Sequence, residues 1–446
     1  MHTQNTTVPG ATPSRRAFLG TSLRVGGLSA LGASLASHAS ASLFERLSAF
    51  TGEPASLASN EDFWLPIQQA FSIDRSIINF NNGGVCPSPV IVQDAMRRML
   101  EFSNRDVPSH ALWTVLQPQI EGVRERMARQ WGVDKEELAF TRNASESLQI
   151  CQMGLDLEPG DEVLTTTVDY PRMVNTFKQR ERRDGIKLVE FKMPIPLESD
   201  DEAVRLFESH ITPKTRAILM CHMVNITGQV LPVKRICEMA RARNIPVIVD
   251  GAHSFAHLDF KLSDLDCDYY GVSLHKWLFA PHGTGLLYVR RDKIKELWPL
   301  MAATEKQDDD IRKFEEFGTR PLANTLAVAE ALTFHQTIGP ARKEARMRYL
   351  RDRWANRLLA HAPGRFRLHT SLDPHYSCGI GTIEIDGIDA TALRTHLHDK
   401  HGIFTIALKH AEFQGIRVTP SVYTTLEEVD RFCEAMESVA KNGLPA

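Results

Sequence analysis

The sequence lacks several features that would narrow its function at once. Its 52 lysines and arginines nearly balance its 55 aspartates and glutamates, and no basic stripe is interleaved with aromatic residues, so nucleic acid is not an expected partner. The seven cysteines are scattered and contain no C-x-x-C pair, so neither a disulfide scaffold nor a metal site is expected. Beyond the first 41 residues no stretch is apolar enough to span a bilayer, and no internal repeat occurs.

What is present begins with a leader. The stretch SRRAFL (14–19) resembles the twin-arginine export signature, a weakly apolar run rich in Gly, Ala and Ser follows, and ASA (39–41) matches a cleavage site. This order predicts a signal peptide over 1–41, read by the twin-arginine (Tat) export machinery, and a periplasmic or secreted mature chain with no stable membrane anchor. The alternative interpretation is a disordered tail with a chance arginine pair.

The remaining chain is long enough for a large domain and an appended smaller one, since 43% of the 446 residues are hydrophobic. We expect a linker over 42–60, an N-terminal segment over 61–90, a large domain over 91–320 and a small C-terminal domain over 321–446. Strand patterns in the large domain alternate with helical ones, which predicts right-handed βαβ units around a mainly parallel sheet. These strand patterns lie at 161–168, 186–191, 216–222 and 246–250.

The alternation stops after a further strand pattern at 286–290. A long helical stretch over roughly 322–361 follows, and a strand at 379–387 then opens the smaller α+β domain. In the large domain, ligands are expected beyond the carboxyl ends of the parallel strands.

A lysine in SLHKW (273–277) needs an explanation, because it lies between an apolar strand and a glycine-rich return strand. Either Lys276 reaches water, or its site lowers its pKa so that it acts as an amine nucleophile. Asp250 ends the strand pattern PVIVD, where a carboxylate points into the ligand crevice; alternatively, it caps the following segment. His253 follows three residues later, and a structural role is equally consistent with its position.

The stretch TRNASES (141–147) places small hydroxyl and amide residues between a strand and a helix. Such a turn leaves backbone N–H groups free to bind an anion, although an ordinary helix N-cap would look the same. A phosphate anchor, a carboxylate for a ring nitrogen and a lysine amine are the three groups that pyridoxal phosphate requires. Their order along the chain favours this cofactor.

Further motifs strengthen this interpretation, and together they resemble the class V aminotransferase family. This is the fold type I group of pyridoxal-phosphate enzymes that includes cysteine desulfurases, kynureninase and isopenicillin N epimerase. The resemblance runs from about Asn79 to Cys433 and implies a large domain with a mainly parallel seven-stranded sheet sandwiched by helices, plus a smaller α+β C-terminal domain. The motifs are TRNASES, TTVDYPRM, CHMVNITGQVLPVKRICEMA, VIVDGAHSF, SLHKWLFAPHGTGLLYV, FGTRP and IRVTPSVYTTLEEVDRF.

The resemblance also implies roles for the matching residues around the cofactor ring. Lys276 would bond covalently to pyridoxal 5'-phosphate, Asp250 would pair with the pyridine nitrogen, and His253 would lie near the ring hydroxyl. Tyr170 would stack on the ring. Asn225 would lie near the ring edge and the substrate.

Other matching positions concern the phosphate and the substrate. Arg417 would grip the substrate α-carboxylate in a two-point contact that a lysine could not copy; from the sequence alone it looks like a solvated strand-edge charge. Thr319 would reach the cofactor phosphate of a neighbouring subunit, which implies a homodimer with shared active sites. The phosphate of the same subunit would be bound by Ala144, Ser145, Ser273 and His275.

One departure from the family pattern bears on the reaction. Desulfurases carry a nucleophilic cysteine shortly before the arginine motif, but TIALKHAEFQGIRV contains none, and Cys378 is predicted to be a buried structural thiol. We therefore expect an isopenicillin N epimerase-like enzyme that acts on an amino acid or small peptide with a free α-amine and carboxylate. Lys276 would remove the α-proton, and Tyr170, His282 or a bound water would return it. A C–S or C–C lyase, an aminotransferase and a non-catalytic cofactor-binding protein stay open as alternatives.

Overall fold

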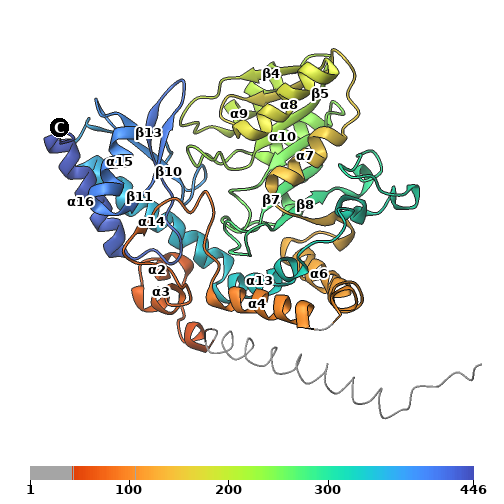
Figure 1. The fold of residues 1–446 in the computed structure, drawn as a ribbon. Coiled ribbons are helices and arrows are strands. Elements are labelled where there is room, and N and C mark those ends of the chain that lie inside the picture. Colours follow the sequence, from red (N-terminus) through yellow and green to blue (C-terminus); the bar gives the residue numbers. More distant parts are fainter. Residues whose placement is uncertain (1–42, 44, 106, 446) are drawn as a thin grey trace, which may run out of the picture.

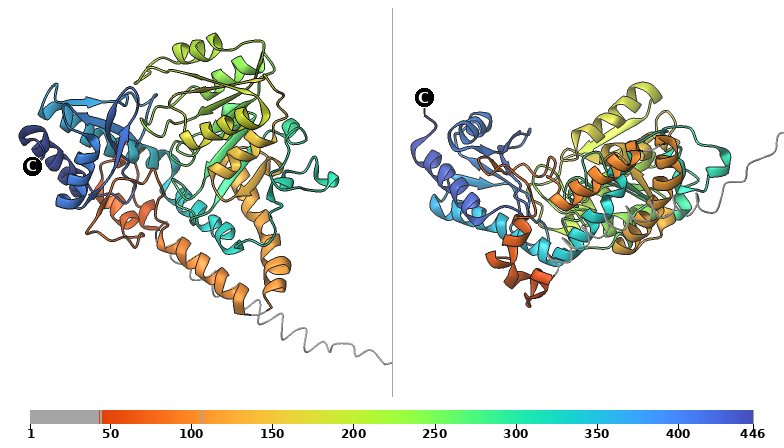
Figure 2. Two further views of the ribbon diagram at one scale, coloured as in Figure 1. Left: turned by 45° about the horizontal axis from the view of Figure 1, so that its top comes forward. Right: turned by 60° about the horizontal axis from the view of Figure 1, so that its bottom comes forward.

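The computed structural model describes residues 43, 45–105 and 107–445, so the predicted signal peptide lies outside the described residues. Figure 1 shows a large sheet flanked by helices and, beside it, a smaller sheet with its own helices. The last of these helices carries the C-terminus. Both views of Figure 2 show the same two parts. Among the described helices, none combines the length and apolar character needed to cross a membrane.

The large sheet has seven strands in the order β2-β8-β7-β6-β5-β3-β4. Strand β8 runs antiparallel to both of its neighbours, and the other adjacent pairs are parallel. This confirms the expected mainly parallel seven-stranded sheet. The strands are β2 (Leu138–Thr141), β3 (Glu162–Thr166), β4 (Lys187–Phe191), β5 (Thr215–Cys221), β6 (Val247–Asp250), β7 (Tyr269–Ser273) and β8 (Gly285–Val289).

Helices cover both faces of this sheet, and the central strands β6, β7 and β8 are buried along their whole length. Successive side chains of a strand point to opposite faces. In β6, Val247 and Val249 pack into the core on one face, with α9 (Asp200–Ser209) and α10 (Val233–Arg241). Ile248 packs on the other face, with α7 (Ala144–Gly154) and α8 (Pro171–Asp184). A short helix, α11 (Leu262–Leu265), precedes β7.

The C-terminal part is a four-stranded antiparallel sheet in the order β12-β13-β10-β9. Its strands are β9 (Phe366–Leu368), β10 (Gly381–Ile385), β12 (Ile406–Lys409) and β13 (Gln414–Val418), and its helices are α14 (Pro340–His361), α15 (Ala390–His401) and α16 (Leu426–Asn442). Apolar residues of α14 and α16 form a second core with this sheet.

The long helical stretch predicted over 322–361 is divided into three helices. They are α12 (Leu322–Leu326), α13 (Val328–Ile338) and α14. The second break is explained by Gly339, whose φ is +93°, and by Pro340 at the start of α14, because a proline has no N–H to continue the preceding helix.

The N-terminal segment joins both parts. Its elements are α2 (Pro54–Leu57), α3 (Glu61–Gln68), β1 (Ile78–Asn79), α4 (Val90–Arg105), α5 (Pro108–His110) and α6 (Ile120–Trp131). Strand β1 pairs in parallel with β11 (Ile403–Phe404) of the small domain, whereas α4 lies beside α13 under the large sheet (Figure 1). Leu47 and Leu57, in the predicted linker, are buried in the same core as Phe63. The domain boundaries themselves stay a prediction.

Candidate active site

Lys276 lies on the turn that follows β7, and its amine contacts an imidazole. Its Nζ is 3.0 Å from Nε2 of His253, and its side chain is half-buried. Burial lowers the pKa of Lys276 to about 8; the charge of Asp250 opposes this shift, and that of Arg417 adds to it. About a tenth of the amine is therefore uncharged at pH 7, far more than for an ordinary lysine, which favours the nucleophile interpretation over a water-facing lysine.

Asp250 ends β6, as the sequence pattern predicts. It is buried, and its Oδ1 accepts a hydrogen bond of 2.9 Å from the backbone N–H of Ala252, so it does cap the following turn. It makes no ion pair with any cation of the described residues. Burial raises the pKa of Asp250 to about 6, and the group is an anion at neutral pH. An unpaired buried carboxylate suits a protonated heteroaromatic nitrogen.

His253 is buried and lies beside the amine of Lys276. Its Nδ1 has no hydrogen-bond partner, and burial holds the pKa of the imidazole well below its usual value, so the ring is neutral. A neutral imidazole has one nitrogen that donates and one that accepts. His253 is therefore equipped to contact both the amine and a polar ring substituent.

The predicted anion cradle and the lysine turn are brought together. Strand β2 ends at Thr141 and α7 begins at Ala144, whose N–H donates a 2.9 Å hydrogen bond to Oγ of Ser273. Asn143 caps α7 by accepting from the N–H of Glu146 at 2.9 Å, so the N-cap interpretation also describes this turn. Gly285, the first residue of β8, lies against this turn: a Cβ there would be 2.5 Å from Oγ1 of Thr141. Only a glycine lets β8 approach so closely.

The other two predicted phosphate residues lie on the same two turns. Ser145 is half-buried in the first turn of α7, and His275 is half-buried next to Lys276. The Nδ1 of His275 is 3.1 Å from the carbonyl oxygen of Thr284, and burial lowers the pKa of this imidazole to about 4. A helix N-terminus with hydroxyl groups beside it is a typical anion site.

Arg417 on β13 is buried, only 7% exposed, so its interpretation as a solvated strand-edge charge is wrong. Its Nη1 donates to the carbonyl oxygen of Asn225 at 3.0 Å and its Nη2 donates to Oδ1 of Asn81 at 2.8 Å, while its Nε has no partner. Burial lowers the pKa of Arg417 to about 10, and Tyr170 opposes this shift. The side-chain oxygen of Asn225 is likewise buried without a partner. Arg417 is therefore a buried cation without an anionic partner, which suits it to bind an anion.

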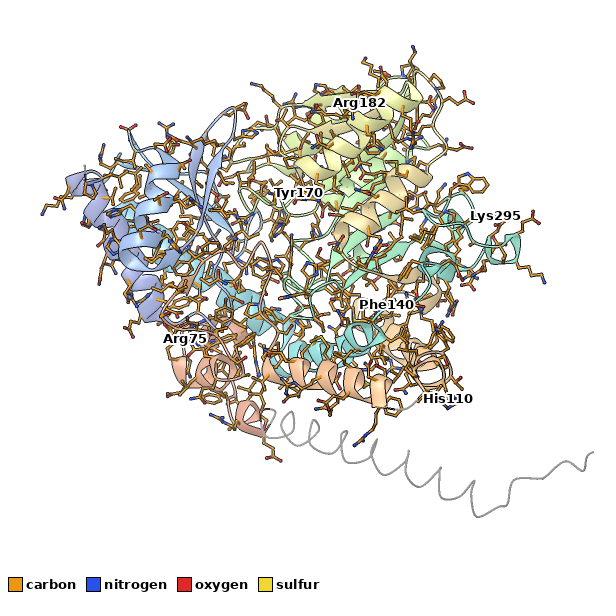
Figure 3. All side chains as sticks on the ribbon, in the orientation of Figure 1. Arg75, His110, Phe140, Tyr170, Arg182 and Lys295 are labelled. Atoms are coloured by element: carbon orange, nitrogen blue, oxygen red, sulfur yellow. The ribbon has the colours of Figure 1, made fainter. Side chains whose placement is uncertain are left out.

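Tyr170 stands at the start of α8, where Figure 3 places it on the side of the large domain that faces the small one. Its side chain is 37% exposed. The preceding residue, Asp169, is a buried carboxylate that accepts from both Thr165 and Thr166 and, at 2.7 Å, from the N–H of Cys221. These bonds fix the loop that carries the tyrosine.

Thr319 lies apart from the other predicted site residues. It is exposed and lines a separate cavity of about 430 Å³ with charged residues such as Glu121, Arg312 and Arg320. None of the residues that line this cavity is among the other predicted site residues. Any contact of Thr319 with a cofactor would have to be made in another subunit.

Two residues that contact the site were not predicted. Asn81 contacts Arg417, and only its place in the polar and glycine-rich run NNGG could have drawn attention to it. Lys343 of α14 is fully buried, donates to the carbonyl oxygen of Trp277 and lies 4.0 Å from the ring centroid of Phe279. Burial lowers its pKa to about 7. Nothing in the helical pattern around Lys343 distinguishes it from a surface lysine.

The residues present fit pyridoxal phosphate. The N-terminus of α7 with Ser273 suits the phosphate, the unpaired carboxylate of Asp250 suits the ring nitrogen, and the amine of Lys276 suits the aldehyde. The unpartnered Nδ1 of His253 and the unpartnered side-chain oxygen of Asn225 leave polar atoms for the ring edge and for a substrate.

Comparisons with known proteins agree with this fit. The family profile described as Aminotransferase class-V matches residues 78–432. An isopenicillin N epimerase of Streptomyces clavuligerus is 31% identical over 404 residues, covering 84% of this chain and 98% of that protein. A probable cysteine desulfurase of Vibrio cholerae is 25% identical over 397 residues, covering 83% and 95%. A solved structure of a C-DES mutant, with glycine covalently linked to its PLP cofactor, has a TM-score of 0.75 at 26% identity and covers 83% of this chain and 98% of that one.

Proposed function

Since the chain belongs to the class-V aminotransferase family, we propose that it epimerises an amino acid or small peptide with a free α-amine and α-carboxylate. The expectation of a pyridoxal-phosphate enzyme with this fold is confirmed; the reaction is the proposal. It is carried by one observation. An amine with a lowered pKa and a buried arginine without a carboxylate partner lie in one site, while every thiol of the chain is buried and unpaired.

Bound pyridoxal phosphate supplies an electron sink for negative charge at the α-carbon. Asp250 keeps a proton on the ring nitrogen, because its carboxylate is buried and has no other cation to pair with. In its uncharged form, the amine of Lys276 removes the α-proton of the substrate. Arg417 binds the α-carboxylate with its planar fork and thereby sets which bond of the substrate faces the lysine.

Epimerisation needs a second group that returns the proton on the opposite face. We assign this role to Tyr170, whose side chain is partly exposed and close enough to Arg417 to influence the pKa of the guanidinium. His282 is exposed; its backbone oxygen accepts from Asn324, and its ring lies 6.5 Å from that of His275, centroid to centroid. It therefore has no comparable link to the substrate arginine.

The thiols argue against persulfide chemistry on the protein. The reactive form of cysteine is the thiolate, which needs an accessible site that lowers the thiol pKa. Here burial raises the pKa of all seven thiols, that of Cys378 to about 12. A lyase that needs no protein thiol is the second candidate, favoured by the likeness to a solved structure of C-DES, described as a cystine C–S lyase, with a TM-score of 0.73 and 26% identity.

The deciding experiment is incubation of the holoenzyme with L- and D-amino acids, L-alanine and cystine among them, in deuterium oxide. Epimerisation predicts deuterium at the α-carbon, appearance of the opposite enantiomer and an intact side chain, all followed by proton NMR and chiral chromatography. Release of pyruvate, ammonia and a persulfide from cystine, with no racemisation, would favour the lyase. Lys276→Ala serves as the control and should show no exchange.

We further propose that the enzyme is a homodimer with shared sites, supported by the exposed position of Thr319 away from the Lys276 turn. Mixing Lys276→Ala protein with Thr319→Ala protein should then restore activity, because one site of the mixed dimer combines both native residues. If mixed samples that have exchanged subunits stay as inactive as the separate variants, the sharing of sites is excluded.

We also propose export by the twin-arginine machinery, supported by the sequence of the leader alone. Replacement of Arg15 and Arg16 by lysine should keep the full-length chain in the cytoplasmic fraction. A periplasmic or secreted product from that variant would contradict the proposal.

A further inference from the structure

Arg417 differs from the other buried arginines of the described chain. Five arginine residues are at most 7% exposed: Arg124, Arg180, Arg346, Arg351 and Arg417. The first four each contact a carboxylate within 2.6 Å. Of these five, Arg417 alone contacts only neutral oxygens, the backbone oxygen of Asn225 and the amide oxygen of Asn81. A buried charge without a counter-ion is costly, so this arrangement calls for a functional reason.

Asn81 is held in place by backbone contacts on both sides. It follows β1, its N–H donates to Oδ1 of Asn79 at 2.9 Å, and it forms a parallel bridge with Thr419, two residues beyond Arg417 on the same chain segment. The N–H of Gly84 donates to its carbonyl oxygen at 3.0 Å. The backbone of Asn81 is thus fixed relative to the strand that carries the arginine, which places its side-chain amide beside Arg417.

The chemistry of the pair settles how the amide is turned. Arginine has only donors, so Asn81 must present its oxygen to Nη2. A neutral oxygen orients the guanidinium plane but leaves its positive charge uncompensated. An aspartate of nearly the same shape would orient the group equally well and would also neutralise it, as the four carboxylates do for the other buried arginines.

We propose that Asn81 is a positioning residue that makes this site selective for substrates with a free α-carboxylate, because it fixes Arg417 without supplying a competing negative charge. The inference rests on the proposed function only in so far as an amino acid must bind here. It predicts two separate failures. Removing the amide lets the guanidinium leave its binding orientation. Replacing the amide by a carboxylate places a competing negative charge beside Arg417, which then binds a substrate carboxylate less well.

The test compares binding of L-alanine and of L-alaninamide, which lacks the carboxylate, to the holoenzyme through the change in visible absorbance of the cofactor. Asn81→Ala and Asn81→Asp should each weaken L-alanine binding about tenfold, the size of one charge-assisted hydrogen bond, and should change L-alaninamide binding less than about twofold. Arg417→Ala gives the upper limit of the effect. The melting temperature of each variant reports whether the fold is intact.

The outcomes separate this inference from the proposed reaction. If Asn81→Ala weakens acid and amide alike, or neither, Asn81 does not act through Arg417. If Asn81→Asp binds L-alanine as the wild type does, the neutrality of the amide has no role. A wild type without preference for L-alanine over its amide would also overturn the inference. By contrast, normal binding without α-proton exchange would refute epimerisation and leave the role of Asn81 standing.

Discussion

At the scale of residues, the site is made by removing charged groups from water and leaving them unpaired. Lys276, Asp250 and Arg417 have pKa values of about 8, 6 and 10, each shifted mainly by burial. Desolvation disfavours the charged form of each group. A bound cofactor and an amino acid would supply the missing counter-charges, so the empty site is less stable than the occupied one.

This environment predicts how the apoenzyme captures its cofactor as a function of pH. Only the uncharged amine attacks an aldehyde, and the pKa of Lys276 is lowered to about 8, so the rate of covalent capture should rise with pH and level off above about 8. Stopped-flow absorbance after mixing with pyridoxal phosphate measures this rate. A midpoint near the ordinary lysine value of about 10.4 would contradict the lowered pKa.

The sequence predicted those site residues that belong to motifs and missed those that act through distant contacts. Lys276, Asp250 and the TRNASES turn lie at ends of strands, and the order of the strands alone places them at one edge. Asn81 meets Arg417 across 336 positions of the chain, and Lys343 meets Trp277 across 66. No local pattern encodes such pairs, because the fold creates them.

At the scale of elements, the loop after β5 joins the two domains. The carbonyl oxygens of Asn225, Ile226 and Thr227 accept hydrogen bonds from Arg417, Thr382 and Thr370, at 3.0, 2.5 and 2.7 Å. These donors all belong to the small domain. The loop therefore fixes the substrate arginine relative to the cofactor residues.

Gly228 ends this loop and should not tolerate a side chain. Its φ is +74°, and a Cβ would lie 2.3 Å from the carbonyl oxygen of Ile380. Gly228→Ala should cost about 1–2 kcal/mol for the backbone conformation and about 1–3 kcal/mol more for the clash. Gly387→Ala is a matched control, since its φ is +75° with nothing within 4 Å. Equal melting temperatures of the two variants would contradict the tight contact.

The pattern of elements was predictable where periodicity decides it. The strand patterns at 161–168, 186–191, 216–222 and 246–250 correspond to β3, β4, β5 and β6, because short apolar and β-branched runs between helical patterns are typical of strands. The division of 322–361 into three helices was not predicted, although Gly339 and Pro340 mark the second of the two breaks in the sequence itself.

At the scale of the whole molecule, buried histidines make stability depend on pH. His222, His253, His257 and His335 are at most 5% exposed, and burial lowers the pKa of all four, to about 3 for His222 and His257. Each is neutral in the folded chain and gains a proton in the unfolded chain below about pH 6.5. The unfolded state is therefore favoured as the pH falls.

Between pH 7.5 and 6 each of these histidines should cost about 0.8 kcal/mol of unfolding free energy, about 3 kcal/mol in total. Asp250, whose pKa is raised to about 6, takes up a proton in the folded state over the same interval and offsets about 0.4 kcal/mol of this loss. The midpoint of urea unfolding of the apoenzyme at the two pH values is the measurement. An unchanged midpoint would show that these imidazoles titrate freely in the folded chain.

The central claim is that the amine of Lys276 is the point at which pyridoxal phosphate is bonded to the chain. Borohydride reduction of the holoenzyme, followed by proteolysis and mass spectrometry, tests it directly because the reduced bond survives digestion. The account predicts a pyridoxyl group on the peptide that contains Lys276. A group on Lys343, the other lysine with a lowered pKa near this turn, or on any surface lysine instead, would contradict it.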